Sequence, residues 1–232
     1  MKFETKIQEI ISRTDVVTSF RFPRPKELDY KPGQFFFVTI KQDDKELRKH
    51  FSFSSSPTEK DHIEFTKRLT DHEFSLALKA AKVGDWARIE APFGKFTFEG
   101  EYPKVALLGG GIGITPFLSY CKNAADKALS SKITLFYGCR TPEDFPFRKE
   151  FETLAEQNKN LKLVFTVSQA SPDWKGETGS IDVDMIKRYL PDYKENMFYT
   201  CGPPGMVEAM ERLIESLGLP KEKLKRELFS GY

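Results

Sequence analysis

Cysteine is scarce in this sequence. The 232 residues include three cysteines, Cys121, Cys139 and Cys201. None lies in a C-x-x-C pair or at a metal-binding spacing, so we expect no iron–sulfur motif and no other metal site. Because the count is odd and the cysteines are not clustered, the sequence favours a reducing compartment.

A strong net charge and long apolar runs are also missing. The formal net charge is +2, so no basic field predicts binding to nucleic acid. No apolar run approaches the roughly 18 residues that a membrane-spanning helix needs. The N-terminal stretch MKFETKIQEI lacks the apolar centre of a signal peptide. We therefore expect a cytoplasmic protein with no membrane span and no nucleic-acid partner.

Phenylalanine, in contrast, is abundant. Hydrophobic residues make up 39% and charged residues 30% of the chain, which is typical of a globular protein. Several of the 21 phenylalanines stand among polar residues, as in QFFFV and KHFSFSSS. Most are expected to fill a core, while some could instead pack against a flat aromatic ligand.

The first hundred residues read as short strands separated by Pro, Gly and Asp, a pattern that predicts an antiparallel Greek-key β-barrel. One helix is expected over residues 71–84, with Gly84 as its C-terminal cap. The expected strands cover residues 2–10, 16–23, 33–40, 49–57, 62–68 and 85–92.

After residue 100 the period changes, because short apolar strands alternate with helical stretches. This order predicts a doubly wound α/β domain with a parallel sheet. We place the domain boundary there, giving domains of residues 1–100 and 101–232. The expected strands cover 104–110, 132–138, 161–168, 196–202 and 223–229, and the expected helices cover 115–129, 144–158, 182–190 and 203–218.

A glycine-rich turn joins the first strand and helix of the second half. Its sequence GGGIGITP contains the pattern G-x-G-x-x-P from Gly111 to Pro116. Nucleotide phosphates bind at such turns, and proline fits the first turn of a helix because its missing N–H has no partner there. The Lys-Ser/Thr of a Walker loop is absent, which disfavours ATP or GTP. A tight strand–helix turn without a ligand is the alternative.

Two further stretches suggest ligand binding. YTCGPPGM places Cys201 at the carboxyl end of a strand, where ligands of open α/β sheets bind and a thiol could flank a nicotinamide ring. A buried small residue at a strand end is the alternative. RKHFSFSSSP alternates Phe51 and Phe53 with hydroxyls after a cation, which could cover a ring and hold a phosphate, or could simply be a polar-faced strand.

Taken in order, these motifs resemble the ferredoxin–NADP reductase superfamily. An R-x-[YF]-[ST]-like strand precedes G-x-G-x-x-P and C-G-P-x-x-M, and the resemblance covers essentially the whole chain. The most similar branch contains the NAD(P)H-dependent flavin reductases that pass electrons to oxygenases, ferredoxins or cytochromes. The resemblance thus implies a reductase that holds FAD, uses NADH or NADPH, and lacks an iron–sulfur domain in this chain.

The resemblance also implies roles for residues of the first half. Phe51 would lie against the isoalloxazine ring, and Ser52 would hydrogen-bond near its N5. Lys49 stands where the family has arginine, which leaves FMN as a less favoured alternative. Thr66, Lys67 and Arg68 would line the flavin or its ribityl chain, and the helix that begins near Ser75 would offer amides to phosphate.

In the second half, the glycine turn and Thr115 would hold the dinucleotide, with Cys201 near the nicotinamide. Phe229 or Tyr232 would shield the other face of the flavin, and Glu227 could support that region. The catalytic residues implied are Ser52, Cys201, Phe229 and Tyr232. The cofactor-binding residues implied are Arg48, Lys49, His50, Phe51, Ser52, Phe65, Thr66, Lys67, Arg68, Phe74, Ser75, Gly110, Gly111, Gly113, Thr115, Arg140, Cys201, Gly202, Pro203 and Met206.

The implied reaction is hydride transfer from nicotinamide C4 to flavin N5, followed by electron transfer to a separate protein or small molecule. Arg140 could meet a 2′-phosphate, but Glu143 and Asp144 follow it, so the sequence leans towards NADH. A nicotinamide dehydrogenase without flavin would need an acid or base near Cys201, and none is recognisable. An electron-transfer subunit that works only in a larger complex remains an alternative.

Overall fold

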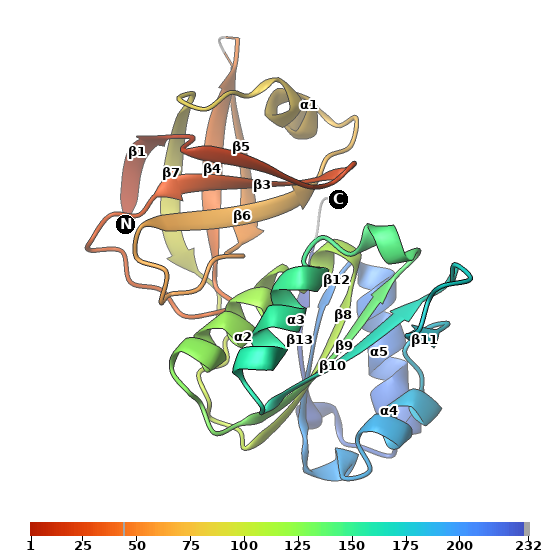
Figure 1. Cartoon of the computed structure of the whole chain (residues 1–232). Coiled ribbons are helices and arrows are strands. Elements are labelled where there is room, and N and C mark those ends of the chain that lie inside the picture. The colour runs from red at the N-terminus through yellow and green to blue at the C-terminus, as the bar shows by residue number, and fades with distance from the viewer. Residues whose placement is uncertain (44, 230–232) are drawn as a thin grey trace.

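The computed structural model describes residues 1–43 and 45–229 and has two halves with different strand arrangements (Figure 1). Antiparallel strands fill the first half of the chain, and a parallel sheet flanked by helices fills the second. The predicted fold class, an antiparallel barrel followed by a doubly wound parallel sheet, is therefore confirmed.

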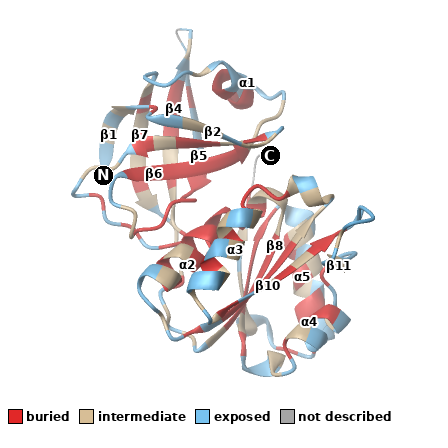
Figure 2. Ribbon diagram, in the orientation of Figure 1, coloured by how far each residue is buried: buried red, intermediate tan, exposed pale blue. Residues whose placement is uncertain are grey.

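The described strands of the N-terminal half form two antiparallel sheets that enclose one core. Five of the phenylalanines in it, Phe20, Phe22, Phe36, Phe53 and Phe65, are completely buried, and Figure 2 shows the buried residues along the facing strands. One sheet has the order β1 (Lys2–Lys6), β7 (Trp86–Phe93), β4 (Phe35–Gln42), β5 (Lys45–Ser52), and the other has the order β2 (Glu9–Thr14), β3 (Val17–Pro23), β6 (His62–Arg68).

Two predictions for this half are wrong in detail. The strand expected over residues 2–10 is two strands in different sheets, because the chain crosses between the sheets at Ile7, whose N–H donates to the carbonyl of Asp85. The helix α1 (Glu73–Ala80) ends at an extended cap residue, Ala81. Gly84, with φ +96°, instead belongs to the turn that leads into β7 and donates to the carbonyl of Ile7.

The C-terminal half is a parallel sheet between two layers of helices. The helices α2 (Thr115–Asp126) and α3 (Arg148–Gln157) pack into one core on one face. The helices α4 (Val183–Tyr189) and α5 (Pro204–Ser216) pack into a second core on the other face. In order across the sheet, the described strands are β11 (Glu177–Thr178), β10 (Leu161–Val167), β9 (Lys132–Cys139), β8 (Lys104–Gly110), β12 (Met197–Gly202) and β13 (Leu224–Leu228).

The segment before α3 also differs from the prediction. The helix expected from residue 144 begins at Arg148. The preceding residues form a short helical turn, η2 (Pro142–Asp144), and an extended stretch in which Phe145 stacks on Trp174 with ring centroids 5.8 Å apart. The helix therefore begins after Pro146, because a proline disfavours the helical conformation of the residue before it, and Phe145 is accordingly extended.

Arg13 of β2 joins the two halves through an ionic contact. Its guanidinium donates to Glu64 of β6 at 3.1 Å and to Glu150 of α3 at 2.6 Å. Glu64 is 1% exposed, and although burial acts to raise its pKa, the charges of Arg13, Lys122 and Arg21 lower it. The carboxylate that anchors Arg13 therefore stays ionised, and the contact is an ion pair rather than a neutral hydrogen bond.

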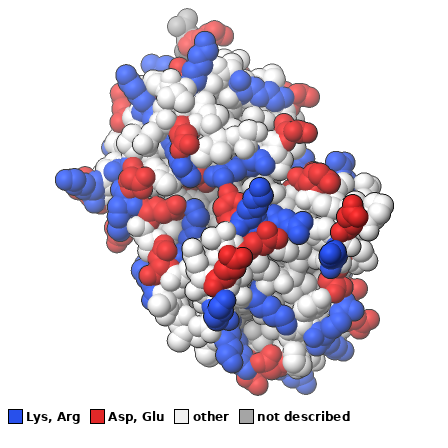
Figure 3. All heavy atoms as spheres, viewed as in Figure 1, with Lys and Arg blue, Asp and Glu red and all other residues white. Residues whose placement is uncertain are grey.

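The surface shows no field of one sign on the face seen in Figure 3, where basic and acidic side chains are interspersed. None of the described helices is both long and apolar enough to cross a membrane.

Candidate functional site

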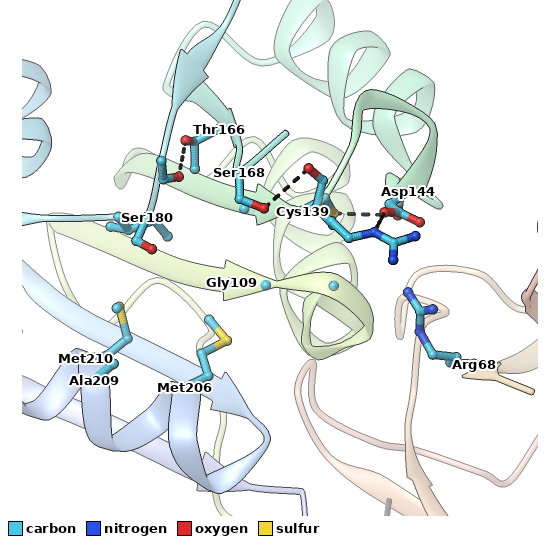
Figure 4. Close-up of a pocket in the computed structure, with 16 residues that line it drawn as sticks. Arg68, Gly109, Cys139, Asp144, Thr166, Ser168, Ser180, Met206, Ala209 and Met210 are labelled. Carbon is cyan, nitrogen blue, oxygen red and sulfur yellow. Dashed lines mark hydrogen bonds and ion pairs between the residues drawn. The ribbon is translucent and has the colours of Figure 1, made fainter. Parts of the chain in front are cut away.

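The largest feature at the carboxyl ends of the parallel strands is a cavity of about 520 Å³ (Figure 4), which we call the nucleotide cavity. It lies beside β8, whose last residues are Gly109 and Gly110, and extends along the ends of β9 and β10 to the start of α5. Its lining residues are Arg68, Gly109, Gly110, Gly111, Gly138, Cys139, Arg140, Asp144, Thr166, Ser168, Gly179, Ser180, Ile181, Met206, Ala209 and Met210.

The glycine turn has the backbone that the sequence pattern requires. Gly111 has φ +50°, and residues Gly111–Ile114 form a short helical turn that leads directly into α2, where Pro116 occupies the first turn. A Cβ on Gly113 would lie 2.4 Å from the carbonyl oxygen of Cys201. The turn therefore packs against the end of β12 so closely that only glycine fits there.

The Cys201 region completes one wall of this turn. The thiol of Cys201 is fully buried and donates to the carbonyl of Gly113 at 3.0 Å. Burial raises the pKa of this thiol well above its ordinary value, so it is a neutral hydrogen-bond donor rather than a nucleophile. Pro203 caps α5, and the sulfur of Met206 lies 2.8 Å from where a Cβ on Gly110 would be. The structure thus brings together the two motifs that the sequence analysis treats separately.

Thr115 lies at the start of α2 and is buried. Its hydroxyl donates to the carbonyl of Ile112 at 3.4 Å, within the turn itself. Its predicted contact with the dinucleotide stays a prediction.

Arg68 is predicted to line the flavin, and this role stays a prediction, since Arg68 borders the nucleotide cavity. It is the last residue of β6 in the N-terminal half, yet it lines the nucleotide cavity and points into it from that half (Figure 4). Lys67, its neighbour, faces a different cavity because successive side chains of a strand point to opposite faces. Arg140, also in the nucleotide cavity, is largely exposed and forms an ion pair with Asp144 at 3.4 Å.

A second cavity of about 540 Å³, which we call the barrel cavity, lies on the N-terminal half. Three cations and two acids line it, both acids are paired with cations outside the cavity, and α1 begins at its edge. Burial and the nearby Lys49 charge lower the pKa of Lys67, so this site favours an anion. The buried Ser75 contacts Thr70 through its hydroxyl at 3.2 Å. The residues lining the barrel cavity are Glu46, Leu47, Arg48, Lys49, His50, Phe51, Lys67, His72, Glu73, Phe74 and Ser75.

A third, smaller cavity of about 100 Å³, which we call the junction cavity, lies where the halves meet. Phe51 borders both it and the barrel cavity, while its ring stacks on Phe65 with centroids 4.3 Å apart. The N–H of Phe229 donates to the carbonyl of Gly202 at 2.9 Å, which ties the C-terminal segment to the nucleotide side. Tyr232 lies outside the described residues. The lining residues are Phe35, His50, Phe51, Ser52, Glu227, Leu228 and Phe229.

Two predicted residues have their side chains inside the barrel. Phe65 is fully buried in the core. The hydroxyl of Thr66 is hydrogen-bonded to Ser19 at 2.7 Å and to Ser54 at 2.9 Å. Their predicted roles in flavin binding have no direct geometric support, since neither side chain lines the barrel or junction cavity.

The sequence analysis missed several lining residues. Phe35 and Leu228 border the junction cavity, and Ser168 and Ser180 border the nucleotide cavity. Ser168 follows β10 directly, so the rule that ligands bind at the carboxyl ends of parallel strands could have found it. No sequence motif marks Phe35, because its place at the junction cavity depends on which strands the fold brings next to it.

Glu227 is the one carboxylic acid among the described residues that line the junction cavity. It lies opposite Cys201 in the β12–β13 register, and its Oε2 atom is buried and has no hydrogen-bond partner among residues 1–43 and 45–229. Burial raises the pKa of Glu227 to about 7. The carboxyl is therefore close to half protonated at neutral pH.

This acid makes stability depend on pH. Because the native pKa of about 7 exceeds the ordinary value of 4.5, the native state binds more protons than the unfolded state between these values. The contribution of Glu227 to the free energy of unfolding is therefore most favourable below pH 4.5. Up to about 3 kcal/mol of that free energy is lost as the pH rises from 4.5 to 7. We expect Glu227→Gln to remove this slope in denaturant titrations at several pH values, whereas Glu222→Gln, an exposed control, should keep it. Equal slopes in all three proteins would contradict the assignment.

Comparison with known proteins finds two domain families in the chain. Residues 2–98 match the family model of the oxidoreductase FAD-binding domain, and residues 107–212 match that of the oxidoreductase NAD-binding domain. The chain is 34% identical over 182 residues to NADH-cytochrome b5 reductase 2 of Meyerozyma guilliermondii, which covers 75% of this chain and 60% of that protein.

Solved structures share the fold over nearly the full length. The cytochrome b5 reductase domain of Ulva prolifera nitrate reductase superimposes with a TM-score of 0.86 at 24% identity, covering 98% of this chain and 97% of that one. A ferredoxin NADP+ reductase from Neisseria gonorrhoeae with bound FAD and NADP gives 0.83 at 20% identity, covering 98% of each chain.

Both halves therefore have the fold and the domain models of flavin- and nicotinamide-dependent oxidoreductases. The chain belongs to the oxidoreductases that combine an FAD-binding domain with an NAD-binding domain, and its cofactors are FAD and a nicotinamide dinucleotide. It spans 60%, 53%, 50% and 64% of the length of four curated relatives that it matches.

Proposed function

We propose that this chain transfers a hydride from NADH to FAD and passes the electrons on to a separate redox protein. The observation that carries the proposal is the junction cavity. Phe51 and Ser52 enter it from the half that matches FAD-binding domains, and Glu227 and Phe229 enter it from the half that matches NAD-binding domains. A reaction between two ring systems needs such a place, because reacting atoms must approach to about 3–3.5 Å.

The barrel cavity fits the phosphates and ring of FAD. Lys49 and Lys67 would neutralise the pyrophosphate, together with the amides at the start of α1. Phe51 borders both the barrel cavity and the junction cavity, so it is placed to support one face of the ring. Bound FAD would supply the ability to accept two electrons and release them singly.

The nucleotide cavity fits the dinucleotide. The backbone of Gly110 to Gly113 and the amides of α2 would approach the pyrophosphate, and Arg68 would add a charge from the other half. Cys201 would support the glycine turn from behind with its buried, neutral thiol, which fixes the wall beside the nicotinamide without competing for its hydride. Phe229 would cover the flavin until the nicotinamide enters, a role that the family resemblance implies for Tyr232 as well.

We propose NADH rather than NADPH as the donor. A 2′-phosphate needs a free cation beside the second or third strand. Arg140 is paired with Asp144, and the end of β10 presents Ser168 to the cavity. Asp144 and Ser168 can hydrogen-bond a ribose hydroxyl, but the charge of Arg140 is already partly neutralised by Asp144 and would bind a phosphate weakly.

The test is an absorbance spectrum followed by initial rates with an uncharged quinone as acceptor. We expect a yellow protein that oxidises NADH at least about tenfold more efficiently than NADPH, which corresponds to about 1.4 kcal/mol. A folded protein that neither carries nor takes up flavin would refute the proposal. A preference for NADPH would refute only the choice of donor.

One alternative retains support from the comparisons. Because the curated relatives are longer than this chain, it could be an electron-transfer subunit or flavin-binding module that acts within a larger complex. Such a module would take up FAD but oxidise NADH slowly without its partner. We also propose, from the sequence, that the domains divide near residue 100 and that the protein works in the cytoplasm.

A further inference from the structure

A fully buried tyrosine reaches the glycine turn from the strand beside it. Tyr137 of β9 is 0% exposed and lies opposite Gly109 in the β8–β9 register. Its hydroxyl donates to the carbonyl of Gly111 at 3.0 Å. Burial raises the pKa of this hydroxyl well above its ordinary value, so it keeps its proton and is a neutral donor. A side chain of β9 therefore holds a backbone group of Gly111, which lines the nucleotide cavity.

Packing alone does not fix the orientation of Gly111. Its φ of +50° lies in the left-handed region, and glycine moves readily between this region and others. Within residues 1–43 and 45–229, no atom outside its own turn and chain neighbours lies within 4 Å of the position that a Cβ on Gly111 would take. The peptide that follows Gly111 therefore depends on hydrogen bonds for its orientation.

The next two carbonyls of the turn are held in the same way. The hydroxyl of Thr115 donates to the carbonyl of Ile112 at 3.4 Å, and the thiol of Cys201 donates to the carbonyl of Gly113 at 3.0 Å. Three consecutive carbonyls thus accept hydrogen bonds from side chains of α2, β9 and β12. The C=O and N–H of a trans peptide point in opposite directions, so each bond that holds a carbonyl also aims the N–H of the next residue. A helix start with its N–H groups aimed outwards binds anions.

We propose that Tyr137 is a positioning residue for the dinucleotide, whose hydroxyl holds the Gly111 carbonyl so that the glycine turn presents N–H groups to the pyrophosphate. The inference rests on the proposed function, which puts the pyrophosphate at this turn. Without the hydroxyl, the Gly111–Ile112 peptide would be free to turn its carbonyl towards the cavity, and a partial negative charge would then face an anion. Tyr137 lines none of the three cavities described above, so it acts on binding and not on hydride transfer.

Tyr120 of α2 provides a matched control. It is also 0% exposed, and its hydroxyl donates to the carbonyl of Phe96 at 2.9 Å. The rings of both tyrosines pack among aromatic side chains. Phenylalanine keeps either ring and removes one hydroxyl, so the two variants lose the same kind of hydrogen bond. The acceptor of Tyr137 lies in the glycine turn, whereas that of Tyr120 lies outside it.

The experiment compares Tyr137→Phe and Tyr120→Phe with the unaltered protein, each loaded with FAD. Calorimetric titration measures the Kd of ADP-ribose, which carries the pyrophosphate but no nicotinamide. Steady-state oxidation of NADH with benzoquinone as acceptor gives KM and kcat separately. Urea titration without nucleotide measures the stability of each protein.

We expect Tyr137→Phe to raise the Kd of ADP-ribose and the KM for NADH together, by about 5- to 10-fold, because one hydrogen bond no longer orders the turn. The kcat at saturating NADH should change by less than about twofold. Tyr120→Phe should leave all three constants within about twofold of the unaltered protein. Both variants should lower the urea midpoint by a similar amount, so that a loss of stability does not explain a difference in binding.

Three results would overturn the proposal. The first is unchanged nucleotide constants in Tyr137→Phe. The second is an equal loss of affinity in the two variants, since a loosened core would then explain both. The third is a lower kcat with an unchanged KM, which would assign the hydroxyl to the reaction itself. A folded, flavin-loaded unaltered protein that neither binds ADP-ribose nor oxidises NADH would refute the proposed function, and this inference with it.

Discussion

Replacing Gly113 with alanine is expected to destabilise the protein by about 3 kcal/mol and to abolish tight binding of NADH. The new Cβ would lie 2.4 Å from the carbonyl oxygen of Cys201 and 3.1 Å from the Cα of Gly202. Both contacts are backbone atoms, so relief requires the glycine turn and the end of β12 to separate, a form of overpacking that costs about 1–3 kcal/mol or more. Denaturant titration and fluorescence titration with NADH measure the two effects.

Gly205→Ala is the matched control. Gly205 lies near the start of α5, and a Cβ there meets no atom within 4 Å. Alanine has a higher helix propensity than glycine, so this variant should be neutral or slightly more stable. If Gly113→Ala behaves like Gly205→Ala, the close packing of the glycine turn on Cys201 is wrong.

The second large effect is expected at Arg68. Its guanidinium lines the nucleotide cavity from the opposite half, where it is placed to contact the dinucleotide phosphates. A hydrogen bond to a charged group contributes about 1.5–3 kcal/mol, so Arg68→Ala should raise the KM for NADH by roughly 10- to 100-fold, while the flavin spectrum is unchanged. Steady-state kinetics with benzoquinone measures this.

Arg140→Ala serves as the comparison for Arg68→Ala. Arg140 lines the same cavity but is largely exposed and already paired with Asp144. Its removal should change the KM for NADH by less than about threefold, since exposed ion pairs contribute about 0–1 kcal/mol. If Arg68→Ala instead releases FAD and leaves the KM for NADH unchanged, Arg68 belongs to the flavin site, as the sequence analysis expects.

The period of the sequence predicts most of the fold. The alternation of apolar and polar residues predicts the antiparallel strands, and short apolar runs between helical stretches predict the parallel sheet. The errors occur where packing imitates a local pattern. Ile7 is buried at the point where the chain crosses from one sheet to the other. The alternation of apolar and polar residues therefore continues across the break between the two strands. Phe145 and Phe147 precede the helically spaced Phe151 and Leu154, yet they lie outside α3, where Phe145 stacks on Trp174.

The candidate site is predictable where it depends on short motifs. Gly111, Gly113 and Cys201 lie in motifs whose chemistry needs those residues, and the structure brings them into contact. Residues whose position depends on distant strands escape this reasoning. Arg68 is an ordinary strand residue until the second half folds against β6, and Phe35 borders the junction cavity because β13 lies across from it.

The ion pair of Arg13 has a consequence for engineering. Exchanging the nicotinamide half for that of another reductase would remove Glu150, while Glu64 would remain buried on the retained half. Such a chimera would keep this ionic contact only if the imported helix carries an acid at the position of Glu150. Selecting donor sequences by that single carboxylate is a simple way to enrich libraries of recombined reductases for correctly assembled members.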